Sequence, residues 1–352
     1  MNFKNFFIRF LLAFAKPFIR TNPGERFLIV STTGLGDTLW GTPAIRALRE
    51  AYPHAYIGVL TSALGKQVLQ NNPHINEFFV VQDPPFLSLL QLFPKLVQRK
   101  IATVLVFHIS QRPILPFCAL IGAGRIIGSE KINKDLDFLL TDRLESQKIH
   151  EIERRLNIVE TATGIKADSK AMEFFPSAED HQKAEALLPP GLVIGIHPGA
   201  KDRFKQWPPS HFIALGNKLK EELGCTLVVT GTPAEKSLVQ QVAQSIEGAI
   251  GIYEGLSIAG LGALISRLSL YITNDTGPLH IACATQTPTI ALFTPTDPTL
   301  CGPYHTPHVS VVEKKPTCFP CLKKKCGDPF CMLQIPPSEV IDMALNKLGV
   351  NV

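Results

Sequence analysis

From residue 27 onward, short apolar runs alternate with longer segments in which apolar positions recur at helical spacing. The short runs predict buried strands, and the longer segments predict helices that bury one face. In the first half the expected strands are 27–30, 56–61, 78–81, 103–108 and 125–128. Helices are expected up to about residue 51, at 64–70, between the third and fourth strands, and at 151–163. This alternation favours a parallel sheet with helices on both faces.

The alternation weakens at residues 129–146 and begins again in the second half. There the expected strands are 192–197, 226–230, 270–273 and 289–293, and the expected helices are 210–223, 234–246, 257–266, 277–284 and 337–348. Residues 177–190 are polar and then Pro-rich, which is typical of a linker. We therefore expect two doubly wound domains, at 25–185 and 186–335, with an N-terminal arm at 1–24 and a C-terminal helix at 336–352.

The N-terminal arm carries an apolar stripe at helical spacing. Its members are Phe3, Phe6, Phe7, Phe10, Leu11, Phe14 and Phe18. No acidic residue precedes Glu25, and the arm is too short and too charged to span a bilayer. A basic, Phe-rich helix suits the interface of an anionic membrane. The alternative is a helix that packs on its own domain, because spacing alone does not distinguish lipid from protein as the apolar partner.

Composition and charge narrow the classes of partner. The chain of 352 residues is 45% apolar and 18% charged, so each half can bury a core. Its formal net charge is +5 and no long Lys or Arg tract is present, which excludes nucleic acid as an expected partner and favours an anionic substrate or membrane. Arg9 and Lys16 interrupt the apolar N-terminus, so no signal peptide is expected, and we expect a cytoplasmic protein, peripheral at the inner membrane.

A glycine-containing loop joins the first predicted strand to the helix after it. Gly34 and Gly36 permit a tight turn and a close approach of backbone to a ligand. The third glycine of the dinucleotide fingerprint is absent, which disfavours a dehydrogenase. Asp37 lies at or near the helix start, where a carboxylate commonly caps free amides, and this is the favoured interpretation from spacing alone. The other interpretation is a general base that deprotonates an attacking hydroxyl.

Polar residues follow three predicted strands of the second half. They are His197, Gly199 and Ala200, then Gly231 and Glu235, then Asn274, Asp275, Thr276, Gly277 and His280. The carboxyl ends of parallel strands share one edge of a sheet, where ligands bind. Free amides at the helix start near Pro278, together with the helix dipole, suit a phosphate group. Lys205 could supply positive charge to a leaving diphosphate. Each residue alone has a structural use, but together they predict a diphosphate site.

At these residues the sequence resembles glycosyltransferase family 9, the ADP-heptose:lipopolysaccharide heptosyltransferases, from about residue 26 to residue 348. Five motifs occur in the family's order. They are GLGD at 34–37 with PAIRAL at 43–48, HPGA at 197–200 with KQWP at 205–208, GTPAE at 231–235, NDTGPLH at 274–280 and FTPTDP at 293–298. One departure is Trp40, which stands where many family members carry a histidine.

The resemblance implies a GT-B fold, in which two Rossmann-like domains face a central cleft, the acceptor mainly on the first and the donor on the second. It implies an inverting transfer of heptose from ADP-heptose to a lipid-linked saccharide, the lipopolysaccharide inner core, with no bound metal or other cofactor required. By this resemblance Asp37 is the general base, Lys205 lies near the departing diphosphate, and Glu235 is a donor ligand at the ribose. Asp275 corresponds to the carboxylate that contacts the heptose, and the diphosphate cradle corresponds to Thr276, Gly277 and His280.

Two other functions stay open from the sequence. One is a related transferase that uses another nucleotide sugar or another glycolipid or polysaccharide acceptor. The other is a non-catalytic module that binds a sugar nucleotide or a glycolipid. The presence of both Asp37 and Lys205 argues against such a module, because binding alone needs no base toward the acceptor.

Four of the eight cysteines lie close together near the C-terminus, namely Cys318, Cys321, Cys326 and Cys331. Four thiolates could hold zinc tetrahedrally, although these spacings are not those of the usual paired knuckles. The alternatives are a reduced, packed loop or disulfides formed after purification. We expect no metal at the catalytic site and a reducing compartment for the protein.

Overall fold

The computed structural model describes residue 8, residues 21–318, residues 321 and 326, and residues 330–350. The helix predicted in the N-terminal arm therefore lies outside the described residues, except for Ile8, which packs against the core of the first half. The chain divides into two compact units, residues 1–172 and 173–352, and each is described by itself. Within the described part of the chain, no helix has the length and apolar character needed to cross a membrane.

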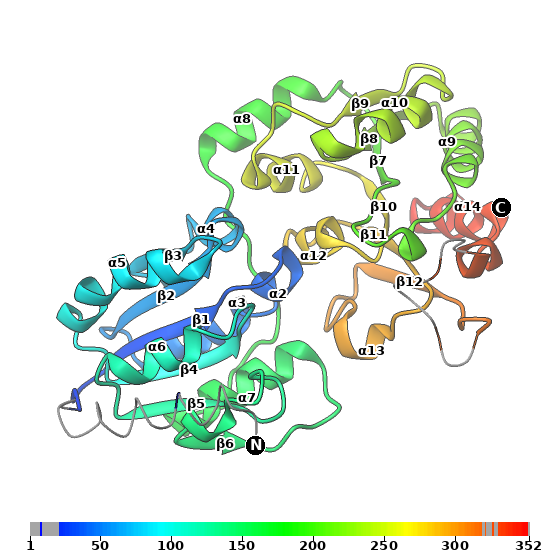
Figure 1. The fold of residues 1–352 in the computed structure, drawn as a ribbon. Helices are drawn as coiled ribbons and strands as arrows, with labels where there is room; N and C mark the ends of the chain where they lie inside the picture. Colours follow the sequence, from blue (N-terminus) through cyan, green and yellow to red (C-terminus); the bar gives the residue numbers. More distant parts are fainter. Residues whose placement is uncertain (1–7, 9–20, 319–320, 322–325, 327–329, 351–352) are drawn as a thin grey trace. The chain divides into compact units, whose positions relative to one another are not determined.

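A sheet of six parallel strands forms the centre of the first unit (Figure 1). Its strands are β1 (Arg26–Ser31), β2 (Tyr56–Ser62), β3 (Glu77–Val81), β4 (Thr103–His108), β5 (Arg125–Ser129) and β6 (Asp142–Leu144). The order across the sheet is β3-β2-β1-β4-β5-β6. The central strands are buried along nearly their whole length, as expected where helices cover both faces of a parallel sheet. The five predicted strands and their parallel pairing are confirmed.

Helices flank this sheet. They are α2 (Leu35–Leu39), α3 (Thr42–Ala51), α4 (Ala63–Leu69), α5 (Pro85–Gln98), α6 (Ile114–Leu120) and α7 (Glu151–Thr163). The helix expected up to residue 51 is two helices, because Pro43 has no N–H to donate to the carbonyl of Leu39 in a continuous helix. The hydroxyl of Thr42 donates to that carbonyl instead, at 2.8 Å.

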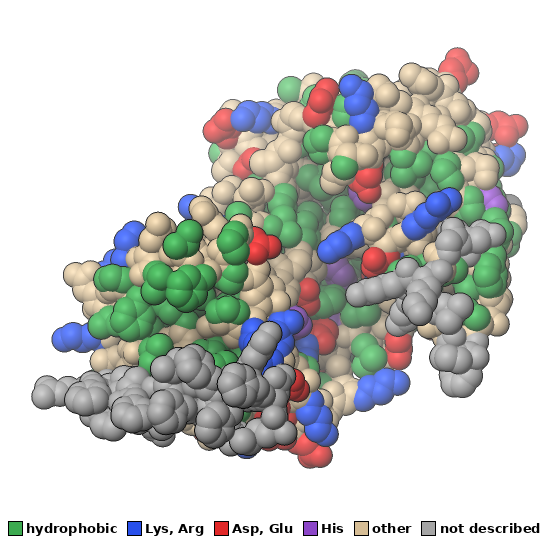
Figure 2. Space-filling view, viewed as in Figure 1, with side chains coloured by type: hydrophobic (Ala, Val, Ile, Leu, Met, Phe, Trp, Pro, Cys, Tyr) green, Lys and Arg blue, Asp and Glu red, His purple; other side chains and the backbone are tan. Residues whose placement is uncertain are grey.

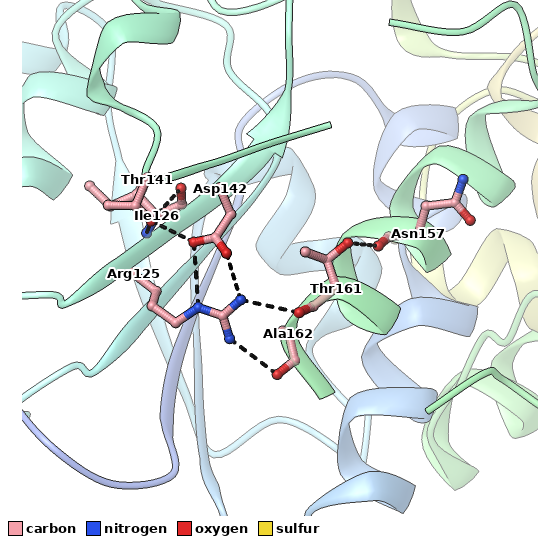
Figure 3. Close-up of polar contacts among 7 residues, drawn as sticks. All are labelled: Arg125, Ile126, Thr141, Asp142, Asn157, Thr161 and Ala162. Carbon is pink, nitrogen blue, oxygen red and sulfur yellow. Dashed lines mark hydrogen bonds and ion pairs between the residues drawn. The ribbon is translucent and has the colours of Figure 1, made fainter. Parts of the chain in front are cut away.

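Residues 129–146, where the hydropathy pattern weakens, contain the short strand β6. Arg125 of β5 fixes its position, since Nη2 donates to Asp142 Oδ1 at 2.7 Å and to the carbonyl of Thr161 at 3.1 Å, while Nη1 donates to the carbonyl of Ala162 at 3.3 Å (Figure 3). A guanidinium suits the last carbonyls of α7, which carry partial negative charge. The same Arg125 hydrogen bond lowers the pKa of Asp142. Polar contacts therefore define this segment, and apolar periodicity could not predict it.

A second sheet of six parallel strands forms the centre of the other unit (Figure 1). Its strands are β7 (Val193–His197), β8 (Thr226–Thr230), β9 (Ile250–Ile252), β10 (Leu270–Asn274), β11 (Thr289–Phe293) and β12 (Val309–Glu313). The order is β12-β11-β10-β7-β8-β9. The four predicted strands are the buried central ones. The unpredicted β9 and β12 are the edge strands, whose partial exposure weakens an apolar run.

The five helices predicted in the second unit are present close to their predicted ranges, and α8 (Ala178–Leu187) and α13 (Pro298–Cys301) are additional. The predicted ones are α9 (Pro209–Leu223), α10 (Lys236–Gln244), α11 (Ile258–Ile265), α12 (Gly277–Ala284) and α14 (Pro337–Lys347). One expectation was wrong, because most of the linker expected at 177–190 is helix α8. Ser177 accepts from the backbone N–H of Asp180 at 3.1 Å, and Asp180 accepts from that of Ser177 at 2.9 Å. This capping box starts a helix where polar composition alone suggested a linker.

Both sheets have the same strand order when each is numbered from its own first strand. The direction of winding reverses between β1 and β4 in the first sheet and between β7 and β10 in the second. Open parallel sheets bind ligands beyond the carboxyl ends of the strands at such reversals. Asp37 follows β1, whereas His197 ends β7 and Asn274 ends β10. The topology thus places Asp37 at the switch point of the first sheet and His197 and Asn274 at that of the second, whereas Gly231 and Glu235 follow the neighbouring strand β8.

Candidate active site

Asn274 joins the two loops at the switch point of the second sheet. It is fully buried at the end of β10, and its Nδ2 donates to the carbonyls of Pro198 at 3.0 Å and Gly199 at 3.2 Å. Its Oδ1 accepts from the backbone N–H of Trp207 at 3.0 Å. Asn274 therefore uses its amide to fix the path of the loop after β7, which makes it a positioning residue in this structure.

Trp207 anchors the other end of that loop. Its side chain is fully buried, its Nε1 donates to the carbonyl of Ile335 at 2.9 Å, and its ring lies edge-on to Phe212 with centroids 4.9 Å apart. A buried indole of this size restricts the backbone around it. Lys205, two residues earlier in a short 3₁₀ turn (Arg203–Lys205), is thereby held close to the sheet.

Lys205 and Asp275 form an ion pair at the carboxyl edge. Lys205 Nζ lies 2.5 Å from Asp275 Oδ2, and the hydroxyl of Thr296 donates to the same oxygen at 2.6 Å. Asp275 is 6% exposed and Lys205 is 19% exposed, so the pair is largely shielded while part of the lysine side chain still reaches solvent. Sequence reasoning assigned roles to Lys205 and Asp275 but none to Thr296. The one feature of the sequence that could have identified Thr296 as a site residue is its position within the motif at residues 293–298.

Helix α12 begins directly after Asp275. Thr276 is its N-cap in an extended conformation without a side-chain cap, Pro278 lies in the first turn, and no acidic side chain occurs in that turn. Thr276 and Gly277 are half-buried, whereas His280 is 4% exposed. Uncapped backbone amides and the positive end of the helix dipole suit an anion. The structure therefore brings the helix start, Lys205 and Asp275 together at one edge of the sheet, whereas the ion pair between the two side chains was not predicted.

Glu235 lies beside the loop after β7. Its Oε2 accepts from the backbone N–H and from the hydroxyl of Thr232, both at 2.8 Å, in a capping box at the turn before α10. A Cβ on Gly199 would lie 2.1 Å from Glu235 Oε1. Gly231 is similarly constrained, since a Cβ there would lie 2.4 Å from Val239. The two glycines allow α10 and Glu235 to approach the sheet.

We expect Gly199→Ala to weaken binding of the nucleotide that the family resemblance implies by about tenfold, which corresponds to about 1.4 kcal/mol. The new methyl group would displace the Glu235 carboxylate and cost about 1 kcal/mol of stability through the capping box. Calorimetric titration with the nucleotide measures the first effect and thermal unfolding the second. Gly124→Ala is the control, because its Cβ would meet nothing closer than 3.7 Å. Unchanged affinity in Gly199→Ala would exclude Glu235 from the nucleotide site.

His197 and Ala200 have buried positions in this region. His197 is 3% exposed, and its Nδ1 lies 3.1 Å from the hydroxyl of Thr230, which is 2.9 Å from that of Tyr271. Burial lowers the pKa of His197, against the opposing charge of Glu235, and so favours the neutral imidazole. Ala200 is also buried, and its carbonyl accepts from Gln206 Nε2 at 2.9 Å. In this structure both residues support the loop that carries Gly199.

Asp37 lies in the first turn of α2, at the switch point of the first sheet. The N-cap of this helix is Gly34, and it has no side-chain cap hydrogen bond. The interpretation of Asp37 as a helix cap, which spacing favoured, is therefore wrong. The carboxylate is 30% exposed and its backbone occupies ordinary helix. Asp37 is thus an accessible carboxylate that does not serve its own helix as a cap.

A buried arginine faces Asp37. Arg155 of α7 is fully buried, and its Nη2 lies 3.6 Å from Asp37 Oδ1. Its Nη1 donates to Glu151 through the side-chain Oε2 at 2.5 Å and the backbone carbonyl at 2.8 Å, and its guanidinium lies 5.7 Å from the ring centre of Trp40. Burial lowers the pKa of Arg155 to about 10, against the opposing charge of Asp37, so the group stays cationic at neutral pH.

Arg155 was not identified from the sequence, although the pattern of apolar residues around it could have revealed it. Ile152, Leu156 and Val159 form the buried stripe of α7, and Arg155 occupies the same stripe at spacing i+3 from Ile152. A charged residue on a buried helical face needs a partner of opposite charge. His108 ends β4, and burial lowers its pKa while the charge of Asp37 opposes that shift.

The cysteine cluster shows no metal-binding geometry. All eight cysteines, each among the described residues, are thiols outside any disulfide, and Cys331 is buried with its Sγ 3.5 Å from the hydroxyl of Thr317. Across the described residues, which include Cys318, Cys321 and Cys326, no three His, Cys, Asp or Glu side chains are grouped so that they could hold a metal ion.

The chain is similar to known glycosyltransferases. The model of glycosyltransferase family 9 (heptosyltransferase) matches residues 118–329, which is more than half of the chain. Lipooligosaccharide heptosyltransferase 2 of Campylobacter jejuni is 26% identical over 329 residues, covering 90% of this chain and 96% of that protein.

Solved structures show the same fold. A family 9 glycosyl transferase from Veillonella parvula superimposes with a TM-score of 0.83 at 24% identity, covering 93% of this chain and 98% of that one. The E. coli ADP-heptose LPS heptosyltransferase II superimposes with a TM-score of 0.77 at 20% identity, covering 92% and 98%. These likenesses confirm the predicted GT-B fold, and the family match confirms the predicted resemblance. The chain therefore belongs to glycosyltransferase family 9, and it is a glycosyltransferase.

Proposed function

We propose that this enzyme transfers heptose from ADP-heptose to a lipid-linked saccharide of the lipopolysaccharide inner core, with inversion at the anomeric carbon. The observation that carries the proposal is the Lys205–Asp275–Thr296 group at the start of α12, at the switch point of the second sheet. The names of its relatives, which are heptosyltransferases acting in lipooligosaccharide and lipopolysaccharide, support the choice of sugar and acceptor class.

In this proposal the second unit, approximately residues 186–335 with the C-terminal helix, binds the donor. The diphosphate lies at the amides of Thr276 and Gly277, with His280 in the same turn. Lys205 contacts the diphosphate, Asp275 the heptose hydroxyls, and Glu235 the ribose. A helix start and an ammonium group both stabilise the negative charge that develops as ADP leaves.

The first unit, approximately residues 25–185, is the acceptor side, with Gly34 and Gly36 shaping the loop that carries Asp37. The acceptor hydroxyl oxygen attacks the anomeric carbon as the bond from that carbon to the diphosphate breaks. The hydroxyl proton passes to Asp37, and ADP departs with the bonding electron pair. Arg155 is a positioning residue, because its cation beside Oδ1 leaves Oδ2 of Asp37 to take the proton. The displacement uses positioning, a base and fixed charges, with no metal or other cofactor.

The proposed class of acceptor also indicates where in the cell the enzyme acts. A lipid-linked saccharide lies at a membrane surface, and we propose that the enzyme works peripherally at the cytoplasmic face of the inner membrane. The basic, Phe-rich arm at residues 1–24 suits contact with anionic lipid there.

A donor screen tests the proposal. Calorimetric titration of the full chain with ADP-heptose and with UDP- and GDP-sugars is expected to show ADP-heptose binding at least about tenfold tighter, or about 1.4 kcal/mol. Mass spectrometry of an inner-core acceptor should then show the mass of one added heptose. Tighter binding of a UDP- or GDP-sugar, with transfer of that sugar, would contradict the proposed donor and favour a related transferase.

A further inference from the structure

Helix α5 of the first unit exposes large apolar side chains to solvent. Phe86 is 64% exposed, Leu87 67%, Leu90 55% and Val97 43%. Figure 2 shows hydrophobic side chains gathered over this part of the first unit. We name these four residues with Pro94 the α5 apolar face. Contiguous apolar patches of this kind on a folded surface mark a binding surface.

The α5 apolar face forms one stripe and is not needed for the core. At 100° per residue, Phe86, Leu90, Pro94 and Val97 fall on the same side of the helix. Another side of the helix packs, with Leu89 and Leu96 buried. Phe93, at the margin between the two sides, lies edge-on to Phe117 at 5.7 Å between centroids. The helix is therefore apolar on both sides, although only one side has a partner within the unit.

Charge around the α5 apolar face is positive. No acidic residue occurs from residue 84 to residue 100, and Lys95 and Lys100 are exposed. From residue 77 to residue 100, three basic residues exceed the two acids, Glu77 and Asp83. Glu77 is paired with Arg99 at 2.6 Å, whereas Asp83 keeps its charge and accepts from the neutral amide of Gln111 at 2.9 Å.

The start of the α5 apolar face lies at the same edge of the sheet as the Asp37 loop. α5 follows β3, so Phe86 and Leu87 stand just beyond the carboxyl end of that strand. Two contacts link this edge to the Asp37 loop. Asp83 is hydrogen-bonded to Gln111, and the hydroxyl of the adjacent Ser110 lies 3.0 Å from that of Thr32, which follows β1.

We propose that the α5 apolar face docks into the interface of an anionic lipid bilayer, with α5 lying along the membrane surface. Its apolar stripe would enter the boundary between headgroups and acyl chains, while Lys95 and Lys100 contact anionic headgroups. This placement sets the Asp37 edge of the sheet near the membrane, where a lipid-linked acceptor presents its saccharide. In that respect the inference rests on the proposed function, and it names a second membrane contact besides the N-terminal arm.

Sedimentation of the full chain with vesicles of phosphatidylethanolamine and phosphatidylglycerol tests this. The triple variant Phe86→Ser, Leu87→Ser, Leu90→Ser is expected to bind at least about tenfold more weakly than the unaltered chain, because large apolar side chains no longer enter the interface. Ile165→Ser is the matched control. It is 55% exposed and follows the end of α7, away from the carboxyl edge, and it should bind vesicles like the unaltered chain.

A second variant keeps the apolar face and alters charge. Lys95→Glu with Lys100→Glu should weaken binding to vesicles that contain phosphatidylglycerol and leave binding to purely zwitterionic vesicles unchanged. Full vesicle binding by the triple variant would overturn the proposal. The proposal would also be overturned if analytical ultracentrifugation showed that the triple variant loses a dimer while its vesicle binding is unchanged. The α5 apolar face would then join two copies of the chain.

The test separates this inference from the proposed function. Thermal unfolding and donor titration of the triple variant should match those of the unaltered chain, because the substituted side chains are exposed and lie outside the donor unit. Transfer to a detached, water-soluble acceptor saccharide should persist, while transfer to acceptor embedded in vesicles falls. If the donor screen shows that ADP-heptose is not the donor, the vesicle experiment still decides whether the α5 apolar face binds the membrane.

Discussion

Asp37→Asn is expected to lower kcat for transfer by about 10²–10⁴-fold while donor affinity stays the same, because the variant lacks the proposed base. Asparagine has nearly the same volume and can occupy the same first turn of α2, so the change removes the charge and the basicity rather than the shape. Asp37 makes no cap hydrogen bond, and Arg155 keeps Glu151 as a charged partner, so we expect the variant to fold. Radiometric or mass-spectrometric turnover together with donor titration measures the two effects.

The control for this variant is Asp83→Asn. Asp83 lies at the same edge of the same sheet but follows β3, and its carboxylate accepts from Gln111. If Asp37→Asn loses turnover because it lacks a base, and not because negative charge is removed from this edge, Asp83→Asn should keep turnover within about twofold of the unaltered enzyme. Near-normal turnover in Asp37→Asn would refute the role of Asp37. Loss of donor binding in that variant would instead indicate that the substitution acts on the second unit.

Lys205→Met is expected to lower kcat by about 10²–10³-fold, the size of effect seen when one fixed donor to a developing negative charge is removed. It should also destabilise the protein by about 3 kcal/mol, since Asp275 is left buried with only the hydroxyl of Thr296 as a partner. This figure is at the low end for a buried ion pair, because Lys205 retains contact with solvent. Lys201→Met is the control, an exposed lysine in the same loop that should change neither quantity.

The double variant Lys205→Met with Asp275→Asn separates the two effects. Neutralising both partners removes the unpaired buried charge, so chemical denaturation should show most of the stability restored relative to Lys205→Met. Turnover should stay low, because the ammonium is still absent and Asp275, the proposed ligand of the heptose, is now altered. Recovery of turnover together with stability would mean that Lys205 serves only to neutralise Asp275, and it would contradict the proposed contact with the leaving diphosphate.

The order of elements was largely predictable from the sequence. Central strands such as β1, β4, β7 and β10 are buried, so their apolar runs are continuous and easily recognised. The errors occur where this signal is weak or absent. Edge strands β9 and β12 are partly exposed, β6 depends on the polar contacts of Arg125, and α8 begins at a capping box within a polar segment.

The candidate site was predictable in a different way. Glycines and short polar motifs after strands identified the loops at 34–37, 197–200, 231–235 and 274–280, because parallel strands bring their carboxyl ends to one edge. The use of each side chain was less predictable. Spacing favoured Asp37 as a helix cap, whereas the structure gives that position to Gly34 and places the buried Arg155 beside Asp37.

The sequence by itself determined the alternation of strands and helices, the parallel sheets, the loops that carry the site and the family resemblance. Only the tertiary structure decided which polar groups meet, such as Lys205 with Asp275, 70 residues apart, and Arg155 with Asp37. It also decided that α5, apolar on both sides, buries one and exposes the other. The physical reason is that the spacing of apolar residues indicates which face of a helix or strand must be buried. Ion pairs and exposed faces depend instead on which elements the fold brings together.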